Sequence, residues 1–500
     1  MRRVINPQMR LGAADISQIQ FDLRSRDEIP KLLMGLQHIY CTPDIKAEVF
    51  KILEEMVPED VDKNNGRPGM DLWKILVLGT IRVNCNWDYD KLHEMSNNHN
   101  TLRLMLGHSI LDRECYAIQT IKDNVSLFTP EILDRINQVV VKSGHKLVCK
   151  KKDDETLKGR CDSFVVETDV HYPTDINLLF DAIRKVITLI AAVCSSLGIT
   201  TWRQSEYNIR KIKKLFRKAQ NLKHSSATTE KKKAEREKLI NDAHREYIKM
   251  VRSFLARVRE TIKTLREKGL VEEEKLLEIE KYIQHAERQI DQVERRVING
   301  QIIPHNEKVF SIFEEHTEWI SKGKAGVPQE LGLKVCILED QHGFILHHHV
   351  MQKETDDKVA VMMVNGAKER FPKLTVCSFD KGFYTPNNRD LLNKELDLVV
   401  LPKKGRLSEK DTVFENSEEF TKYRRKHSAV ESAINAVENH GLDRCLDHGI
   451  DGFKRYIGLA VVSRNIQILG RIIQNNKANA EKRLEGLNVW RKGKLKQRSA

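Results

Sequence analysis

Length, composition and charge limit the classes of protein that this chain can be. With 500 residues, 40% of them hydrophobic, it can bury sizeable cores, which excludes a disordered tail or a small stapled module. The formal net charge is +14, from 85 Lys and Arg against 71 Asp and Glu, and this balance favours a polyanionic partner such as nucleic acid.

Cysteine usage and hydropathy indicate where the chain works. The nine cysteines are scattered and lack metal-knuckle or redox-pair spacing, which predicts a reducing compartment. The first residues, MRRVINPQMRLGAAD, lack the apolar core of a signal peptide, and the most apolar run, VITLIAAVCSSLG at 186–198, is too short to span a bilayer. We therefore expect a soluble cytoplasmic protein without a membrane partner.

Residues 1–148 are predicted to form a helical N-terminal domain. Apolar residues recur with helical periodicity through 28–143. Compact helical groups of this kind often present one helix to a DNA groove, although a plain packing domain gives the same pattern. The basic net charge favours DNA binding, and the polar run CKKKDDETLKGRC predicts a charged linker over 149–162.

The first convincing strand follows this linker. SFVVETDVH, residues 163–171, alternates so that Asp169 shares a face with Val165 and Glu167. We predict that 163–180 is the first part of an α/β core. Glu167 is more simply explained as an ion-pair partner than as a metal ligand, although either role is open.

A helical insertion is predicted over 181–330. Within 231–298 the apolar residues step by three and four in two seams, 248–265 and 276–297, with Gly269 between them. This pattern predicts an antiparallel coiled-coil hairpin. Such a hairpin could hold a dimer, track DNA or pack on the core, and the seams are our candidate for holding a dimer.

The remainder of the core is predicted over 331–475, before a basic C-terminal tail at 476–500. Its strands are expected at 333–340, 343–352 and 396–405, and in the run LTVCSFDKGFYT at 374–385. In that last run Asp380 follows a buried strand. Open α/β sheets place their chemistry at such carboxyl ends.

A late basic helix supplies a third acidic candidate. In KYRRKHSAVESAINAVENHGLDRC, 422–445, an apolar stripe that includes Val430 and Val437 would pack on the sheet, with Glu431 on the polar face beside it. Three neighbouring carboxylates repel one another unless cations hold them together. Two Mg²⁺ ions about 4 Å apart would do so, and that arrangement cleaves and transfers phosphodiesters.

Several ordered motifs together resemble bacterial insertion-sequence transposases with an Asp-Asp-Glu active site, most closely the ISNCY group. The motifs are VVETDVHYPTD (165–175), HTEWISKGKAG (316–326), VCILEDQHGFILHHHVM (335–351), CSFDKGFYTP (377–386) and RRKHSAVESAINAVENHGLDRC (424–445).

The resemblance implies a fold, a site and partners. The fold would be a ribonuclease-H-like α/β core, a mixed sheet with flanking helices, preceded by an all-α domain and interrupted by the helical insertion. Asp169, Asp380 and Glu431 would be both the catalytic residues and the ligands of two Mg²⁺ ions, with Mn²⁺ as a substitute. The partners would be double-stranded DNA, as terminal inverted repeats and target DNA, and a second copy of the chain in a bacterial or archaeal nucleoid.

The residues that flank the glutamate depart from one large branch of these enzymes. That branch has Arg four residues before the glutamate and Lys seven after it, where this chain has His427 and Glu438. We therefore give DNA contacts only as candidates. They are Trp319, Lys381, Lys403, Lys404, Arg424, Arg425 and His427.

Two other functions remain open from the sequence. A metal-dependent nuclease of the same fold would cut DNA without joining it to a target. A non-catalytic DNA-binding protein could retain a degenerate core. The presence of three carboxylates in strand or helix contexts argues against the second alternative.

Overall fold

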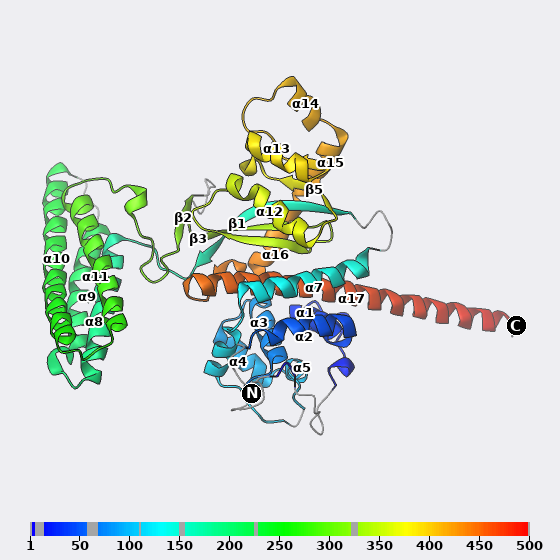
Figure 1. Ribbon diagram of the computed structural model, residues 1–500, viewed down its shortest axis with the longest axis horizontal. Helices are drawn as coiled ribbons and strands as arrows, with labels where there is room; N and C mark the ends of the chain where they lie inside the picture. Colours follow the sequence, from blue (N-terminus) through cyan, green and yellow to red (C-terminus); the bar gives the residue numbers. More distant parts are fainter. Residues whose placement is uncertain are drawn as a thin grey trace. The chain divides into compact units, whose positions relative to one another are not determined.

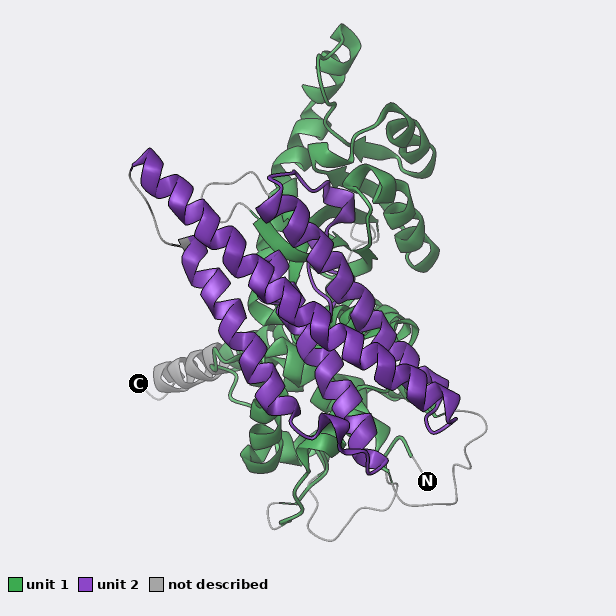
Figure 2. Cartoon of the chain, turned by 90° about the vertical axis from the view of Figure 1, so that its left-hand side faces the viewer, with its two compact units in different colours: residues 1–169, 320–500 green, residues 170–319 purple. Residues whose placement is uncertain are grey.

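The computed structural model describes most of the chain as two compact units (Figure 1). The described residues are 3–5, 15–57, 69–109, 112–149, 156–224, 229–321 and 329–498. Unit 1 comprises residues 1–169 and 320–500, and unit 2 comprises residues 170–319 (Figure 2). Among the described residues, no helix combines the length and the apolar character that a membrane span requires.

The N-terminal part of unit 1 is helical, as its periodicity predicts. Asp27 and Thr129 cap the first and last of its helices by accepting backbone N–H groups. Leu33, Trp73 and Leu78 are completely buried in its core. The helices are α1 (Glu28–Cys41), α2 (Pro43–Glu54), α3 (Leu72–Asn84), α4 (Tyr89–Asn98), α5 (Asn100–Met105), α6 (Ile118–Val125) and α7 (Pro130–Val148).

The second part of unit 1 is a mixed sheet of seven strands. The strands follow the order β2-β3-β1-β5-β6, with β4 paired to β3 and β7 paired to β1. β1 runs antiparallel to β3 and parallel to β5, β5 is parallel to β6, and β3 is antiparallel to β4. The strands are β1 (Leu157–Thr168), β2 (Glu318–Ser321), β3 (Gln329–Glu339), β4 (Ile345–Met351), β5 (Leu374–Phe379), β6 (Leu398–Val400) and β7 (Arg444–Cys445).

Helices of the second half of the chain flank this sheet. We expected one helix through the region of Glu431, but the structure divides it into α15 and α16 at Ser428, and Gly441 ends the following turn with a φ of +100°. The helices are α12 (Asp356–Arg370), α13 (Pro386–Glu395), α14 (Glu409–Glu415), α15 (Glu418–His427), α16 (Ala429–Val437) and α17 (Gly449–Arg498).

α17 joins the N-terminal helices to the sheet, and Figure 1 shows it beside α7 between them. Gly470 lets α17 cross α1 closely, since a Cβ there would lie 1.8 Å from the Lys31 carbonyl oxygen. Asn465 of α17 binds the β4 backbone, with its Oδ1 accepting from the Ile345 N–H at 2.9 Å. Residues 1–148, which we predicted as a separate domain, therefore share one compact unit with the sheet.

Unit 2 is a bundle of long helices between β1 and β3 in the sequence (Figure 2). Its first helix begins before residue 181, where we expected the insertion to start. Three ion pairs join the two segments of the hairpin: Arg252–Glu294, Arg259–Glu287 and Arg266–Glu280. From one pair to the next the arginine number rises by seven and the glutamate number falls by seven, so α10 and α11 are antiparallel, as predicted. The helices are α8 (Asp175–Ser196), α9 (Ser205–His224), α10 (Glu230–Glu267) and α11 (Glu273–Val293).

The two apolar seams are used inside unit 2 and are not available for a dimer. The twelve seam residues from Ile248 to Val293 are at most 3% exposed. They share one core with α8 residues such as Ile183 and Ile187, so α8 and α9 complete a bundle around the hairpin. The idea that these seams hold a dimer is therefore wrong, because their apolar surface is already covered.

Removing one seam side chain tests this internal role. Leu255→Ala should lower the free energy of unfolding of unit 2 by about 2–5 kcal/mol, because it leaves a cavity in a buried core. The matched control Leu277→Ala, on the exposed side of α11, should change it by less than about 0.5 kcal/mol. Light scattering should give the same mass for both variants as for the unaltered chain, and a folded Leu255→Ala chain that loses a dimer would contradict us.

Candidate active site

The register of the sheet brings Asp162 and Asp380 together. β1 and β5 are parallel, with Cys161 opposite Phe379, so the next residue of each segment is an aspartate. Neighbouring strands lie about 4.8 Å apart, so the two side chains leave the sheet as neighbours. β5 ends there, and β7 pairs only with the last two residues of β1, which leaves an open stretch of the β1 edge.

Glu431 reaches this region from the first turn of α16. Val430 and Ile434, on the apolar side of the helix, are buried in the same cluster as Phe164 of β1. The predicted stripe therefore does pack on the sheet. Glu431 itself is exposed, on the polar side of α16, and the packing of the helix fixes its position against β1.

The electrostatics of Asp162 show which acids converge. Burial raises the pKa of Asp162 to about 6, and the backbone N–H of Ser163 opposes this by lowering it. The negative charges of Asp380, Asp356 and Glu431 raise the pKa of Asp162 further. These carboxylates are therefore close enough to repel one another.

Asp356 differs from Asp162, Asp380 and Glu431 because a hydroxyl and an ammonium group bind its carboxylate. Its carboxylate accepts a hydrogen bond from the Ser163 hydroxyl at 2.7 Å and lies 3.1 Å from the Lys334 ammonium. In the described part of the chain, Asp162, Asp380 and Glu431 form no ion pair with a lysine or arginine. The negative charge of these three carboxylates is thus left uncompensated.

His427 also lies at this site. Its Nδ1 is 3.0 Å from the Ser378 hydroxyl, which in turn contacts the Gly159 carbonyl. Burial lowers the pKa of His427, the nearby Asp380 carboxylate raises it, and Arg160 lowers it. We predicted His427 as a DNA contact, and the structure places it beside the acidic residues at the last turn of α15.

The donor set of the three carboxylates fits a hard divalent cation. Mg²⁺ and Mn²⁺ prefer carboxylate oxygens, and a cation would offset both the burial and the repulsion that raise the pKa of Asp162. The residues that would hold it are Asp162, Asp380 and Glu431. Their oxygens are more widely spaced than those of a one-ion cluster, for which all ligand atoms lie within 4.8 Å.

Asp169 does not join this site, contrary to our prediction. It follows the end of β1, seven residues beyond Asp162, which corresponds to about 20 Å along a strand. Its side chain is 55% exposed and lies 3.6 Å from the Arg444 guanidinium. Arg444 also pairs with Glu167 at 3.3 Å, which agrees with the ion-pair role that we favoured for Glu167.

The missed residue, Asp162, lay in the predicted linker 149–162. β1 begins at Leu157, and Leu157, Gly159 and Cys161 are buried in alternation. That alternation was present in the sequence, but the charged residues before and between these positions hid it. The linker residues 150–155 lie outside the described part of the chain.

The predicted loop lysines differ in their surroundings. Lys381 is exposed and directly follows Asp380. Lys404 donates from Nζ to the Gly382 carbonyl at 2.8 Å, so it fixes the loop after Asp380. Lys403 is paired with Asp411 and is therefore neutralised. Of the three, Lys381 is the one best placed for a phosphate near the carboxylates.

The predicted arginines of α15 are exposed. Arg424 has a 58% exposed side chain and lies 3.9 Å from Glu415, a distance at which an exposed pair contributes little. Arg425 is exposed as well. Both remain candidates for phosphate contacts.

Trp319, in unit 2, is half-buried among aromatic rings. Its ring meets Tyr172 edge-on at 5.8 Å and Phe310 at 5.6 Å. These rings line a cavity of about 450 Å³ that also receives Lys223 and Arg296. Packing therefore accounts for part of the side chain, and a DNA contact of Trp319 stays a prediction.

A second acidic cluster in the N-terminal helical region is explained by its own hydrogen bonds. His108, Asp112 and Glu114 have ligand atoms within 4.8 Å of one another. However, the two ring nitrogens of His108 already contact Asp112 at 2.7 Å and the Tyr116 hydroxyl at 2.6 Å. We interpret the cluster as a structural network of this loop.

The electrostatic strain at Asp162 gives a measurable pH dependence. Its pKa is higher in the folded chain than the ordinary 3.8, so between about pH 4 and 6 the folded chain holds a proton that the unfolded chain has lost. Stability without divalent metal should therefore fall as the pH rises through this window. Asp162→Asn should raise the free energy of unfolding by about 3 kcal/mol above pH 7, measured by urea denaturation.

Asp169→Asn is the matched control for this prediction, because it makes the same change just past the end of the same strand. It should keep the pH dependence of the unaltered chain. Equal stability of Asp162→Asn and the unaltered chain at both ends of the pH window would contradict the raised pKa of Asp162.

A comparison with known proteins finds a family model that matches part of the chain. Residues 292–466 match the family model described as "Transposase DDE domain". No curated protein and no solved structure matches the chain significantly. The matched segment contains Asp380 and Glu431, together with β3 to β7, while Asp162 lies outside it. Residues 292–466 are thus similar to a transposase DDE domain.

Proposed function

We propose that the protein is a DNA transposase of an insertion sequence, of the ISNCY group, with a ribonuclease-H-like core. The observation that carries the proposal is the convergence of Asp162, Asp380 and Glu431 on one edge of the mixed sheet, two of them within the segment similar to a transposase domain. In this proposal Asp162 takes the role that the sequence had suggested for Asp169.

The residues of the site divide the work of phosphoryl transfer. Asp162, Asp380 and Glu431 hold the divalent cations, proposed as two Mg²⁺ with Mn²⁺ as a substitute. When bound, these ions supply activation of the attacking oxygen and stabilisation of the leaving oxygen. Lys404 holds the loop that follows Asp380, and Lys381 beside it is placed to attract a phosphate.

Two in-line displacements follow from this chemistry. Water attacks the phosphodiester at the element end, the P–O3′ bond breaks, and a 3′-hydroxyl is released. That hydroxyl then attacks a phosphodiester of the target, which forms the new P–O bond and frees a target 3′-hydroxyl. Both displacements use the same carboxylates.

The partners proposed are duplex terminal inverted repeats and target DNA, on which two copies of the chain would assemble as a homodimer. The N-terminal helices are proposed to bind DNA, and the site of action would be the cytoplasm and nucleoid of a bacterium or archaeon. The net charge of +14 supports these proposals.

Carboxylate substitutions test the site. Asp162→Asn, Asp380→Asn and Glu431→Gln should each lower Mg²⁺-dependent cleavage of labelled element-end DNA at least about 1000-fold, since each removes a metal ligand. DNA binding without metal should persist. Asp169→Asn is the matched control and should keep full activity, whereas loss of cleavage in Asp169→Asn with retention in Asp162→Asn would reverse our assignment.

Joining of ends separates a transposase from a nuclease. With precleaved end DNA and a supercoiled target plasmid, the unaltered chain and Mg²⁺ should give a product in which the labelled 3′ end is covalently joined to the plasmid. Cleavage without any joined product would establish the nuclease alternative. Absence of both reactions, with DNA binding intact, would establish the non-catalytic one.

A further inference from the structure

Helix α9 of unit 2 has an unusually one-sided charge. Its sequence, SEYNIRKIKKLFRKAQNLKH, contains seven lysines and arginines and one glutamate, a balance of 7 − 1 = +6 over 20 residues. Ile212 and Ala219 are buried in the bundle, so the apolar side of α9 is used internally. The charged side must therefore face away from the core of unit 2.

The cations of α9 form a continuous exposed stripe. Arg210, Lys214 and Arg217 follow each other at steps of four and three, which places them on one side of a helix, and Lys211 and Lys213 flank them. All five are exposed. Within the described ranges, none of the five has an ion pair or a side-chain hydrogen bond, and we call these five residues the α9 basic face.

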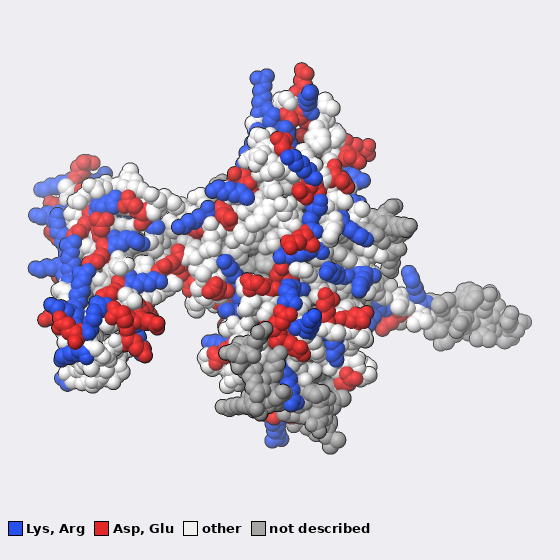
Figure 3. Space-filling model, in the orientation of Figure 1, with Lys and Arg blue, Asp and Glu red and all other residues white. Residues whose placement is uncertain are grey.

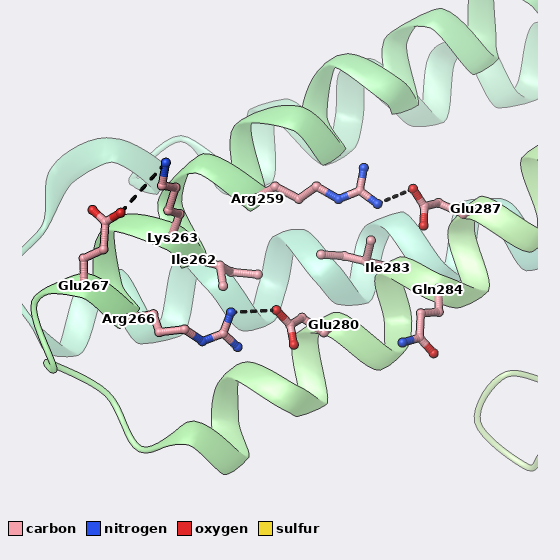
Figure 4. Close-up of a pocket in the computed structure, with 9 residues that line it drawn as sticks. All are labelled: Arg259, Ile262, Lys263, Arg266, Glu267, Glu280, Ile283, Gln284 and Glu287. Carbon is pink, nitrogen blue, oxygen red and sulfur yellow. Dashed lines mark hydrogen bonds and ion pairs between the residues drawn. The ribbon is translucent and has the colours of Figure 1, made fainter.

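Cations of unit 2 that lie between α10 and α11 are paired with glutamates. On the face drawn in Figure 3, basic and acidic side chains are interspersed. In a groove of about 620 Å³ between α10 and α11, Arg259 is paired with Glu287 and Arg266 with Glu280 (Figure 4). α11 carries six acidic and three basic residues, so it offsets part of the basic excess of its neighbour α10. Such paired charges offer little attraction to a polyanion.

We propose that the α9 basic face binds the phosphate backbone of duplex DNA, as a contact separate from the carboxylate site. The stripe from Arg210 to Arg217 is about 10 Å long, which matches about three successive phosphates of one strand. The choice of DNA as the polyanion rests on the proposed function. Unit 2 thus acts as a sequence-independent arm of the protein that holds DNA.

Salt dependence measures this contact directly. Each phosphate neutralised contributes about 0.9 to the slope of log K against log salt concentration. The full-length variant Arg210→Gln, Lys214→Gln, Arg217→Gln should therefore bind a fluorescent random-sequence DNA duplex with a slope smaller by about 3 than the unaltered chain. The titrations are done in EDTA, so that no cleavage takes place.

The chain offers a control with the same change in charge. Arg252→Gln, Arg259→Gln, Arg266→Gln also removes three cations at helical spacing from unit 2, but these are already paired with glutamates. Its slope should change by less than about 1. Circular dichroism melting of both variants should match that of the unaltered chain, because exposed charges contribute little to stability.

Equal slopes for the α9 variant and the unaltered chain would overturn the proposal. An equal decrease of the slope in the α9 variant and in the α10 control variant would overturn it too. A decrease of the slope of the α9 variant that is seen with an RNA duplex and not with a DNA duplex would overturn the proposal as well. The outcome is independent of catalysis: a chain that fails to cleave DNA but shows the α9-specific slope keeps this contact, whereas one that cleaves DNA without that slope keeps the proposed function alone.

Discussion

The parallel pairing of β1 with β5 is the constraint on which the candidate active site depends. It places Asp162 beside Asp380, at the point where β5 ends and the edge of β1 opens. Burial raises the pKa of Asp162, and the negative charges of Asp380, Asp356 and Glu431 raise it further, so the ionised form of this carboxylate costs stability. A neutral residue in place of Asp162 would avoid this cost, and the cations that we propose for the site would offset it.

The rest of unit 1 keeps this edge in place. α16 carries Glu431 and is held against β1 by Val430 and Ile434. α17 packs against α1 through Gly470 and hydrogen bonds β4 through Asn465, so the N-terminal helices support the sheet. Unit 2 enters the chain just after β1 and has a core of its own. The DNA contact that we propose for α9 therefore rests on other residues than the carboxylate site.

The sequence predicted where helices and strands lie along the chain better than it predicted which of them pack together. Helical periodicity identified α10 and α11, and the apolar run before Asp380 identified β5. The start of β1 was missed because Lys158 and Arg160 gave it the polarity of a linker, and this error moved the strand carboxylate from Asp162 to Asp169. Local periodicity does not encode long-range pairings. It therefore could not show which strand lies beside β1 or which helix covers the apolar seams.

The most direct test of the central claim is to locate the metal. Anomalous diffraction at the manganese edge from crystals grown with Mn²⁺ should show density bounded by the carboxylates of Asp162, Asp380 and Glu431, and this density should disappear in Asp162→Asn. Manganese bound at Asp169, or at His108 and Asp112, with none at the edge of β1, would contradict the account.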